Sequence, residues 1–232
     1  MIGEDGLERL RNACAVVYGL GGVGGYAFEA LVRAGVGRLY VVDGDCIEPS
    51  NINRQLLALD VTVGTRKVDA ARERAVHINP DAVVVSVFGR ITPDNADRLV
   101  PEDVQYAVDA IDTIDAKAAL LLSLLRRGTR FVSCMGAARR MDPAAVRVAD
   151  IREVSGCPLA RRVRMALKKQ SVTGGIRCVF SSERPAPVPS GDSDSDPEDG
   201  IHRKRPQGSL SYVPGIIGLT AAGLIIQDIL SG

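Results

Sequence analysis

The stretch Cys14-Ala15-Val16-Val17-Tyr18, followed by Gly19-Leu20-Gly21-Gly22-Val23-Gly24, decides the fold. Its first five residues form an apolar run that predicts a buried strand, and residues 23–34 have the apolar spacing of a packed helix. The glycines between them allow a tight turn and let backbone N–H groups approach a phosphate at the helix N-terminus. This unit predicts an α/β fold: a Rossmann-like, mostly parallel sheet with helices on both faces and a C-terminal elaboration.

A second apolar run, residues 38–42, predicts a strand that ends at Asp43. A carboxylate in this position, roughly 20 residues beyond the glycine turn, can bind the hydroxyl groups of a ribose. Taken together, the turn and Asp43 fit NAD as well as ATP. The first 43 residues therefore leave a dinucleotide and a triphosphate as alternatives.

Polar residues further along favour the triphosphate. Arg54 follows the second strand on the side of an open α/β sheet where ligands bind, and a guanidinium suits the charge of a phosphate under attack. Lys67 begins a predicted helix, and Asp112 follows a predicted buried strand, residues 104–111, where a carboxylate can hold Mg²⁺. The alternative is that Arg54 and Lys67 are solvated surface charges and that Asp112 caps the next helix.

Longer motifs make the pattern specific. The first half contains GLGGVG (19–24), VVDGDCIEPSNINRQ (41–55), GTRKVDAA (64–71), INP (78–80) and DAIDTIDAK (109–117). This series resembles the adenylating domain of ubiquitin-activating-enzyme-like (ThiF/MoeB-type) proteins. The second half contains SCMGAA (133–138), MDP (141–143), CPLAR (157–161) and GSLSYVP (208–214), which resemble the tRNA threonylcarbamoyladenosine dehydratase branch. The resemblance covers nearly the whole chain except the acidic stretch near residue 195.

The resemblance implies a role for each nucleotide-binding residue. The residues that would line the nucleotide are Gly19, Gly21, Gly22 and Gly24, and Asp43 would take the ribose. The residues that would surround the phosphates are Asn51, Arg54, Gln55 and Lys67. Asp112 would position Mg²⁺, Lys117 stands where relatives carry a basic residue near the site, and Asp45 matches the second acid of a strand-end pair.

The resemblance also implies a reaction. Threonylcarbamoyladenosine in tRNA would be dehydrated to its cyclic form through an acyl-adenylate, with release of AMP and pyrophosphate, and Arg54, Lys67 and Asp112 would be the catalytic residues. One alternative is adenylation of the C-terminus of a ubiquitin-like or sulfur-carrier protein. The second alternative is an NAD-binding oxidoreductase.

The cysteines bear on the first alternative. The five residues Cys14, Cys46, Cys134, Cys157 and Cys178 are scattered and odd in number, which predicts reduced thiols rather than a disulfide framework. The sequence contains no CxxC pair, so a structural four-cysteine zinc site is not expected. The loop before the last predicted helix also has no cysteine for thioester or persulfide chemistry.

The charge distribution points to a polyanionic partner. The formal net charge is only +1, yet residues 126–184 hold 14 Lys/Arg against 4 Asp/Glu. The candidate contacts to tRNA phosphates are Arg139 and Arg140 in a loop, and Arg161, Arg162, Arg164, Lys168 and Lys169 on a predicted helix, residues 158–169. The alternative is an ordinary solvated helix face.

We expect one adenylating domain over residues 1–232, with a nucleotide-binding core (1–135), a substrate-facing elaboration (136–232) and a flexible loop at about 184–208. The N-terminus lacks the apolar core of a signal peptide, which predicts a cytoplasmic protein. The final apolar run, residues 215–230, is short and broken by glycine, so it predicts a closing helix rather than a membrane span.

The resemblance further implies a homodimer, and it admits a sulfurtransferase partner. Relatives of this kind also carry an arginine upstream of the first helix that reaches a nucleotide. In this chain either Arg9 or Arg11 substitutes for it, or the start is assigned late, or ATP turnover is impaired.

Overall fold

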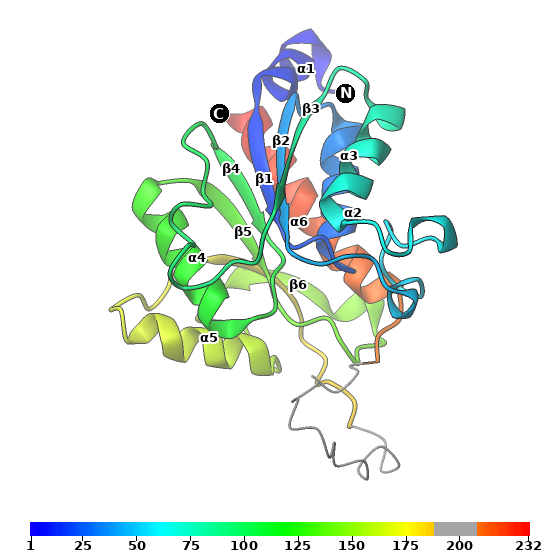
Figure 1. Cartoon of the computed structure of the whole chain (residues 1–232). Coiled ribbons are helices and arrows are strands. Elements are labelled where there is room, and N and C mark those ends of the chain that lie inside the picture. The colour runs from blue at the N-terminus through cyan, green and yellow to red at the C-terminus, as the bar shows by residue number, and fades with distance from the viewer. Residues whose placement is uncertain (188–207) are drawn as a thin grey trace.

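The computed structural model describes residues 1–187 and 208–232, which form six α-helices and one seven-stranded sheet. The strands are β1 (Cys14–Tyr18), β2 (Arg38–Asp43), β3 (Val83–Phe88), β4 (Tyr106–Asp109), β5 (Arg130–Cys134), β6 (Val146–Asp150) and β7 (Arg177–Ser181). The helices are α1 (Gly3–Asn12), α2 (Gly24–Ala34), α3 (Lys67–Ile78), α4 (Ile114–Arg127), α5 (Pro158–Lys168) and α6 (Tyr212–Ser231). Figure 1 shows the sheet as a twisted central layer with helices on both sides.

The strand order is β3-β2-β1-β4-β5-β7-β6, and every neighbouring pair is parallel except β7 and β6. The chain moves outward from β1 in one direction and then returns to start again at β4, on the other side of β1. At such a switch point the connections after the two strands leave in opposite directions and open a crevice at their carboxyl ends. The glycine turn follows β1, so it lies at this crevice.

Alternate side chains of β1 enter two separate cores. Ala15 and Val17 pack with residues of α2, α3 and α6 on one face of the sheet. Val16 and Tyr18 pack with residues of α4 and α5 on the other face. Successive side chains of a strand point to opposite faces, so an unbroken apolar run is what a strand covered on both sides requires. The predicted fold class is confirmed.

β4 is shorter than the strand expected at residues 104–111, and Asp112 lies three residues beyond its end. The cause is side-chain competition for the backbone of Ile111. The Ile111 N–H donates to Oδ1 of Asp109 (3.3 Å), and the Ile111 carbonyl oxygen accepts from Nζ of Lys117 (3.0 Å). Both groups therefore bond to side chains and not to a neighbouring strand, and the last hydrogen bond to β1 is donated by the Ala110 N–H to the Tyr18 carbonyl oxygen.

α6 extends the closing helix expected at residues 215–230. Its length and composition would suffice to cross a membrane, but 50% of its most apolar window is buried within the protein. A Cβ at Gly218 would lie 2.2 Å from the carbonyl oxygen of Val23, and one at Gly22 would lie 3.4 Å from Cβ of Pro214. α6 therefore packs directly against the glycine turn and the start of α2.

The flexible loop expected at residues 184–208 falls largely outside the described residues. Its described ends lie together, because the Arg139 N–H donates to the Gly208 carbonyl oxygen (3.0 Å) and the Ala186 N–H donates to the Arg139 carbonyl oxygen (2.9 Å). β6, β7 and α6 add to the same sheet and cores as the earlier elements.

Candidate functional site

The glycine turn connects β1 to α2 through a backbone path that side chains would block. Gly19 has φ +83°, in the left-handed region. A Cβ at Gly24 would lie 1.7 Å from the carbonyl oxygen of Gly19, well inside van der Waals contact. The turn therefore brings the N-terminus of α2 within a few residues of the end of β1, where free N–H groups and the helix dipole favour an anion.

Asp43 is oriented by the backbone around it. Its Oδ2 accepts a hydrogen bond from the Leu20 N–H (2.6 Å), and its Oδ1 accepts one from the Asp45 N–H (2.8 Å). The carboxylate is thus held between the glycine turn and the segment after β2, the place expected for a group that binds a ribose.

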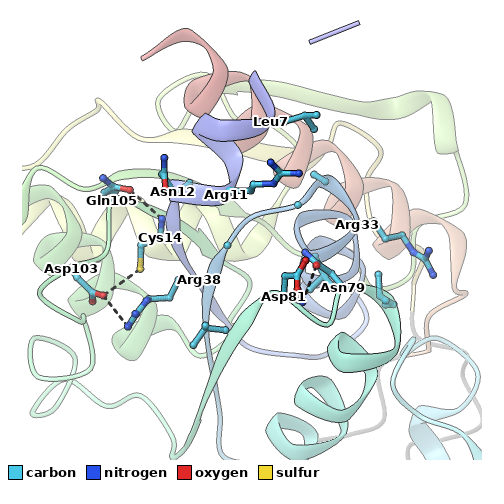
Figure 2. A pocket seen from close by; sticks show the side chains of 17 residues that line it. Leu7, Arg11, Asn12, Cys14, Arg33, Arg38, Asn79, Asp81, Asp103 and Gln105 are labelled. Atoms are coloured by element: carbon cyan, nitrogen blue, oxygen red, sulfur yellow. Dashed lines mark hydrogen bonds and ion pairs between the residues drawn. The ribbon is translucent and has the colours of Figure 1, made fainter. Parts of the chain in front are cut away.

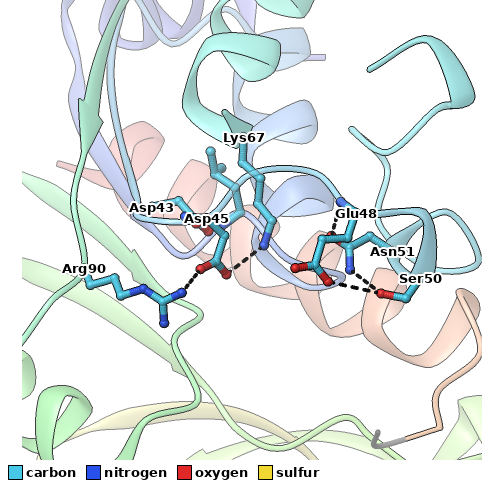
Figure 3. Close-up of polar contacts among 8 residues, drawn as sticks. Asp43, Asp45, Glu48, Ser50, Asn51, Lys67 and Arg90 are labelled. Carbon is cyan, nitrogen blue, oxygen red and sulfur yellow. Dashed lines mark hydrogen bonds and ion pairs between the residues drawn. The ribbon is translucent and has the colours of Figure 1, made fainter. Parts of the chain in front are cut away.

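Asp45 links two cations beside this carboxylate, as Figure 3 shows. Its Oδ2 lies 3.1 Å from Nζ of Lys67 and its Oδ1 lies 2.6 Å from Nη2 of Arg90. Lys67 is buried at the start of α3, whereas Arg90 is exposed. Asp45, whose role is open from sequence alone, thus joins Lys67 and Arg90 at the carboxyl edge of the sheet.

Arg90 is a charged residue at this edge that the sequence analysis did not find. It follows β3, the third parallel strand whose carboxyl end reaches the edge. A Cβ at Gly44 would lie 2.4 Å from Cγ of Arg90, so the glycine after Asp43 makes room for this side chain. The signal available in the sequence was Gly44 directly after Asp43, because a glycine there allows another side chain to approach closely.

The segment after β2 supplies three further polar side chains. Asn51 ends a short 3₁₀ helix (Pro49–Asn51), and Nη1 of Arg54 donates to the Ser50 carbonyl oxygen (2.8 Å). Oε1 of Gln55 is buried and has no hydrogen-bond partner among the described residues. Nε2 of Gln55 is the atom nearest to a Cβ at Gly21, at 4.0 Å. A buried, unpartnered amide oxygen beside the turn is what a polar ligand would satisfy.

Asp112 lies on the segment that joins β4 to α4, with an exposed side chain. This segment packs on the glycine turn: the Ala110 N–H donates to the Tyr18 carbonyl oxygen (2.9 Å), and a Cβ at Gly19 would lie 3.0 Å from the Ala110 carbonyl oxygen. The structure therefore brings Asp112 to the same crevice as the turn, although it is far away in sequence.

Two expected site residues, Lys117 and Arg140, lie in the protein interior. Lys117 is fully buried, and its Nζ lies 2.7 Å from Oδ2 of the equally buried Asp109. Arg140 is also buried and donates to the carbonyl oxygens of Ser181 (3.0 Å) and Gly156 (3.3 Å). Burial lowers the pKa of its guanidinium, and Arg140 is removed from the candidate tRNA contacts.

Helix α5 presents the remaining basic residues. Its buried side is formed by Ala160, Val163 and Leu167, and its exposed basic side chains are Arg161, Arg162 and Lys168, with Lys169 just after the helix. Arg164 is half-buried, since its Nη1 donates to the carbonyl oxygens of Ile151 (2.9 Å) and Val154 (2.7 Å). Arg139 is also half-buried. Figure 1 shows α5 beside α4, at the end of the molecule opposite to α1.

A cavity of about 1010 Å³ lies at the other edge of the sheet, where β1, β2 and β3 begin at Cys14, Arg38 and Val83 (Figure 2). Two of its charged side chains, Arg38 and Asp103, form an ion pair (3.7 Å between Nη1 and Oδ2). Because the cavity lies where the strands begin and the crevice lies where they end, the length of the strands separates the two.

The two arginines of the first helix lie at the cavity end of the molecule. Arg11 lines the cavity, and Nη1 of Arg9 donates to the Leu230 carbonyl oxygen (2.8 Å). Within one chain, neither arginine reaches the crevice.

All five cysteines are free, as expected, and Cys46 is exposed while the other four are buried. Burial raises the pKa of the Cys14 and Cys134 thiols to about 12. Burial also raises the pKa of the Cys178 thiol. These three thiols stay protonated near neutral pH and are poor nucleophiles.

Comparisons with known proteins identify a family and several similar proteins. A family model described as the ThiF family matches residues 1–232. A Bacillus subtilis (strain 168) protein named tRNA threonylcarbamoyladenosine dehydratase is 37% identical over 232 residues, which cover 99% of this chain and 91% of the relative. The crystal structure of E. coli tRNA N6-threonylcarbamoyladenosine dehydratase in complex with AMP has a TM-score of 0.88 at 32% identity, covering 99% of this chain and 90% of that one. The ATP complex of the same E. coli enzyme has a TM-score of 0.86 at 31% identity, with the same coverage.

Proposed function

Because this chain belongs to the ThiF family, we propose that it is an ATP-dependent tRNA threonylcarbamoyladenosine dehydratase, which cyclises the modified adenosine. The observation that carries the proposal is the convergence at one crevice of the glycine turn, Asp43, Lys67 and Asp112. This convergence occurs in a fold that aligns over 99% of the chain with an E. coli dehydratase bound to ATP.

ATP would bind across the carboxyl ends of β1, β2 and β4. Backbone N–H groups at the start of α2 would meet its phosphates, and Asp43 would accept hydrogen bonds from its ribose. Lys67 is paired with Asp45, so an incoming phosphate would compete with that carboxylate for the ammonium group. Arg54 would contribute a second positive charge and the amide of Gln55 a hydrogen bond.

We propose Mg²⁺ as the metal, held by Asp112 together with the phosphates. Among residues 1–187 and 208–232 no three His, Cys, Asp or Glu side chains are grouped to hold a metal ion. The Asp43 and Asp45 carboxylates already bind backbone N–H groups, Lys67 and Arg90, and the Asp112 carboxylate suits Mg²⁺, which is usually bound by one or two carboxylates plus substrate phosphates. When bound, the ion would neutralise developing negative charge on the phosphates.

The chemistry would then proceed by activation and ring closure. The carboxylate of the threonylcarbamoyl group attacks the α-phosphate of ATP, forming an acyl-adenylate and releasing pyrophosphate. A nitrogen of the same group attacks the activated carbonyl carbon and expels AMP, which closes the ring with net loss of water. The protein contributes positioning and charge neutralisation through Arg54 and Lys67. No protein nucleophile is needed, and the buried thiols of Cys14, Cys134 and Cys178 are poorly suited to be one.

The exposed basic residues around α5 would bind tRNA through its phosphates. Arg161, Arg162, Lys168 and Lys169 form a basic surface, defined here as the α5 surface. Contacts to phosphates supply affinity and orientation rather than sequence selectivity. Arg139, in the loop after β5, would add a contact nearer to the crevice.

Removing two charges from the α5 surface tests this role. We expect Lys168→Ala/Lys169→Ala to raise the dissociation constant for tRNA about tenfold near physiological salt, and to lower the slope of log K against log salt by about 2. The matched control is Arg11→Ala/Arg72→Ala, which removes two exposed charges elsewhere. Equal losses of affinity in both variants, measured by fluorescence titration, would show that only net charge matters.

We also propose a cytoplasmic homodimer. The resemblance supports dimer formation, and Leu219 on α6 is an exposed apolar residue. A tRNA substrate supports the cytoplasmic location. A sulfurtransferase partner rests on the resemblance alone.

Mass spectrometry of nucleosides tests the function directly. Threonylcarbamoylated tRNA incubated with the protein and MgATP should lose one water, about 18 mass units, from the modified nucleoside with matching AMP release. The ring must be preserved by mild buffers. An unchanged nucleoside, together with ATP–pyrophosphate exchange stimulated by a Gly-Gly-ending carrier protein, would favour the carrier-protein alternative instead.

A further inference from the structure

A fully buried polar cluster lies directly beneath the crevice, at the carboxyl ends of β4 and β5. It consists of Asp109, Lys117 and Ser133, none of which is exposed beyond 1%. Oδ2 of Asp109 lies 2.7 Å from Nζ of Lys117 and accepts a hydrogen bond from Oγ of Ser133 (2.6 Å). The mechanism above uses none of these three residues.

The ammonium group of Lys117 uses all of its donors. Besides Asp109, it donates to the carbonyl oxygens of Ile111 (3.0 Å) and Cys134 (2.8 Å). An ammonium group has three N–H bonds, so each has one partner in a protein interior. Lys117 therefore ties the end of β4, the end of β5 and the segment after β4 to a single point.

Ile111 is held by the cluster from both sides. Its N–H donates to Oδ1 of Asp109 and its carbonyl oxygen accepts from Lys117. Asp112 is the next residue, and Ala110, the residue before, packs on Gly19 of the turn. The cluster thus fixes the backbone that carries Asp112 relative to the turn that would hold the phosphates.

Stability alone is a weak reason for such a pair. Burying two charges costs desolvation energy that their attraction roughly repays, and apolar residues of similar volume often serve as well. Lys117 donates hydrogen bonds to two backbone carbonyl groups next to a candidate metal carboxylate, and an apolar residue could not fix the backbone in this way.

We propose that Lys117 is a positioning residue, which acts through Asp109 and Ile111 to hold Asp112 where a metal ion on the phosphates can reach it. The proposal rests on the proposed function only for the role of Asp112. Its consequence is specific: the cluster governs the Mg²⁺-dependent part of ATP affinity, and not the affinity for tRNA.

The test uses Asp109→Asn/Lys117→Met in the full chain, which removes both charges and leaves no unpaired buried ion. ATP dissociation constants are measured by calorimetry with Mg²⁺ and with EDTA. We expect the ratio of the two constants, the Mg²⁺ advantage, to fall about tenfold, while affinity for ATP in EDTA changes less than about twofold. The matched control is Arg177→Met/Asp228→Asn, which removes an ion pair between β7 and α6 away from the crevice and should leave the ratio unchanged.

An unchanged Mg²⁺ advantage in the double variant overturns the proposal. This includes the case in which ATP affinity falls by the same factor with Mg²⁺ and with EDTA. If the double variant does not fold, Ser133→Ala decides by the same criterion. This substitution removes one hydrogen bond to Asp109 and keeps both charges, and the ratio should fall about threefold. A wild-type protein that binds no ATP at all would refute the proposed function instead, so the two failures are distinguishable.

Discussion

Asp112→Asn is expected to abolish ATP-dependent turnover while the protein stays folded. The side chain is exposed on the segment between β4 and α4, and asparagine has the same shape, so the fold should tolerate the change. The lost negative charge removes the one carboxylate that we assign to Mg²⁺. Such a metal contributes several kcal/mol to the transition state, so the rate of AMP release should fall by about 10³-fold or more.

Asp115→Asn is the matched control. Asp115 is also exposed and lies three residues further on, in the first turn of α4. It should retain near-normal turnover, and both variants should keep the wild-type circular dichroism spectrum and melting temperature within a few degrees. Near-normal turnover of Asp112→Asn would show that the metal assignment is wrong.

Gly24→Ala is expected to disrupt the nucleotide site and the fold together. Its new Cβ would lie 1.7 Å from the carbonyl oxygen of Gly19, a backbone atom that cannot rotate away. Either the turn or the start of α2 must move. We expect a loss of about 3 kcal/mol in the free energy of unfolding and at least about a hundredfold loss of ATP affinity.

The neighbouring residue in the same helix provides the control. A Cβ at Gly25 would meet nothing closer than 3.7 Å, so Gly25→Ala should be accommodated. Its higher helix propensity should leave the protein as stable as the wild type or more stable by up to about 1 kcal/mol. Urea titration and calorimetry compare the two variants, and similar behaviour of both would contradict the steric argument.

The local part of the site could be predicted from sequence. The residues from Gly19 to Gly24 and Asp43 lie next to strands that apolar runs mark clearly, and their roles depend on short stretches of chain. Asp112 could be placed at the same edge because the carboxyl ends of parallel strands meet there. The resemblance supplied the reaction, which no spacing of residues encodes.

The long-range part could not be predicted. Arg90 enters the site through an ion pair with Asp45, 45 positions away in the chain, and it lies just after β3, a strand whose bounds were not predicted. Lys117 and Arg140 are charged residues in the interior, whereas most charged residues are exposed. Only the paths of β4, β5 and the loop around Gly156 reveal that carbonyl oxygens surround them.

The packing of α6 on the glycine turn has a consequence for how the protein is made. Synthesis runs from the N-terminus, and early parts of a chain can begin to fold before later parts leave the ribosome. The turn at Gly22 and Val23 emerges long before its neighbours in space, Pro214 and Gly218. A nascent chain therefore carries a nucleotide-binding motif whose outer wall arrives only after α6 has been synthesised. A chain truncated before α6 lacks that wall, so its glycine turn stays open on one side.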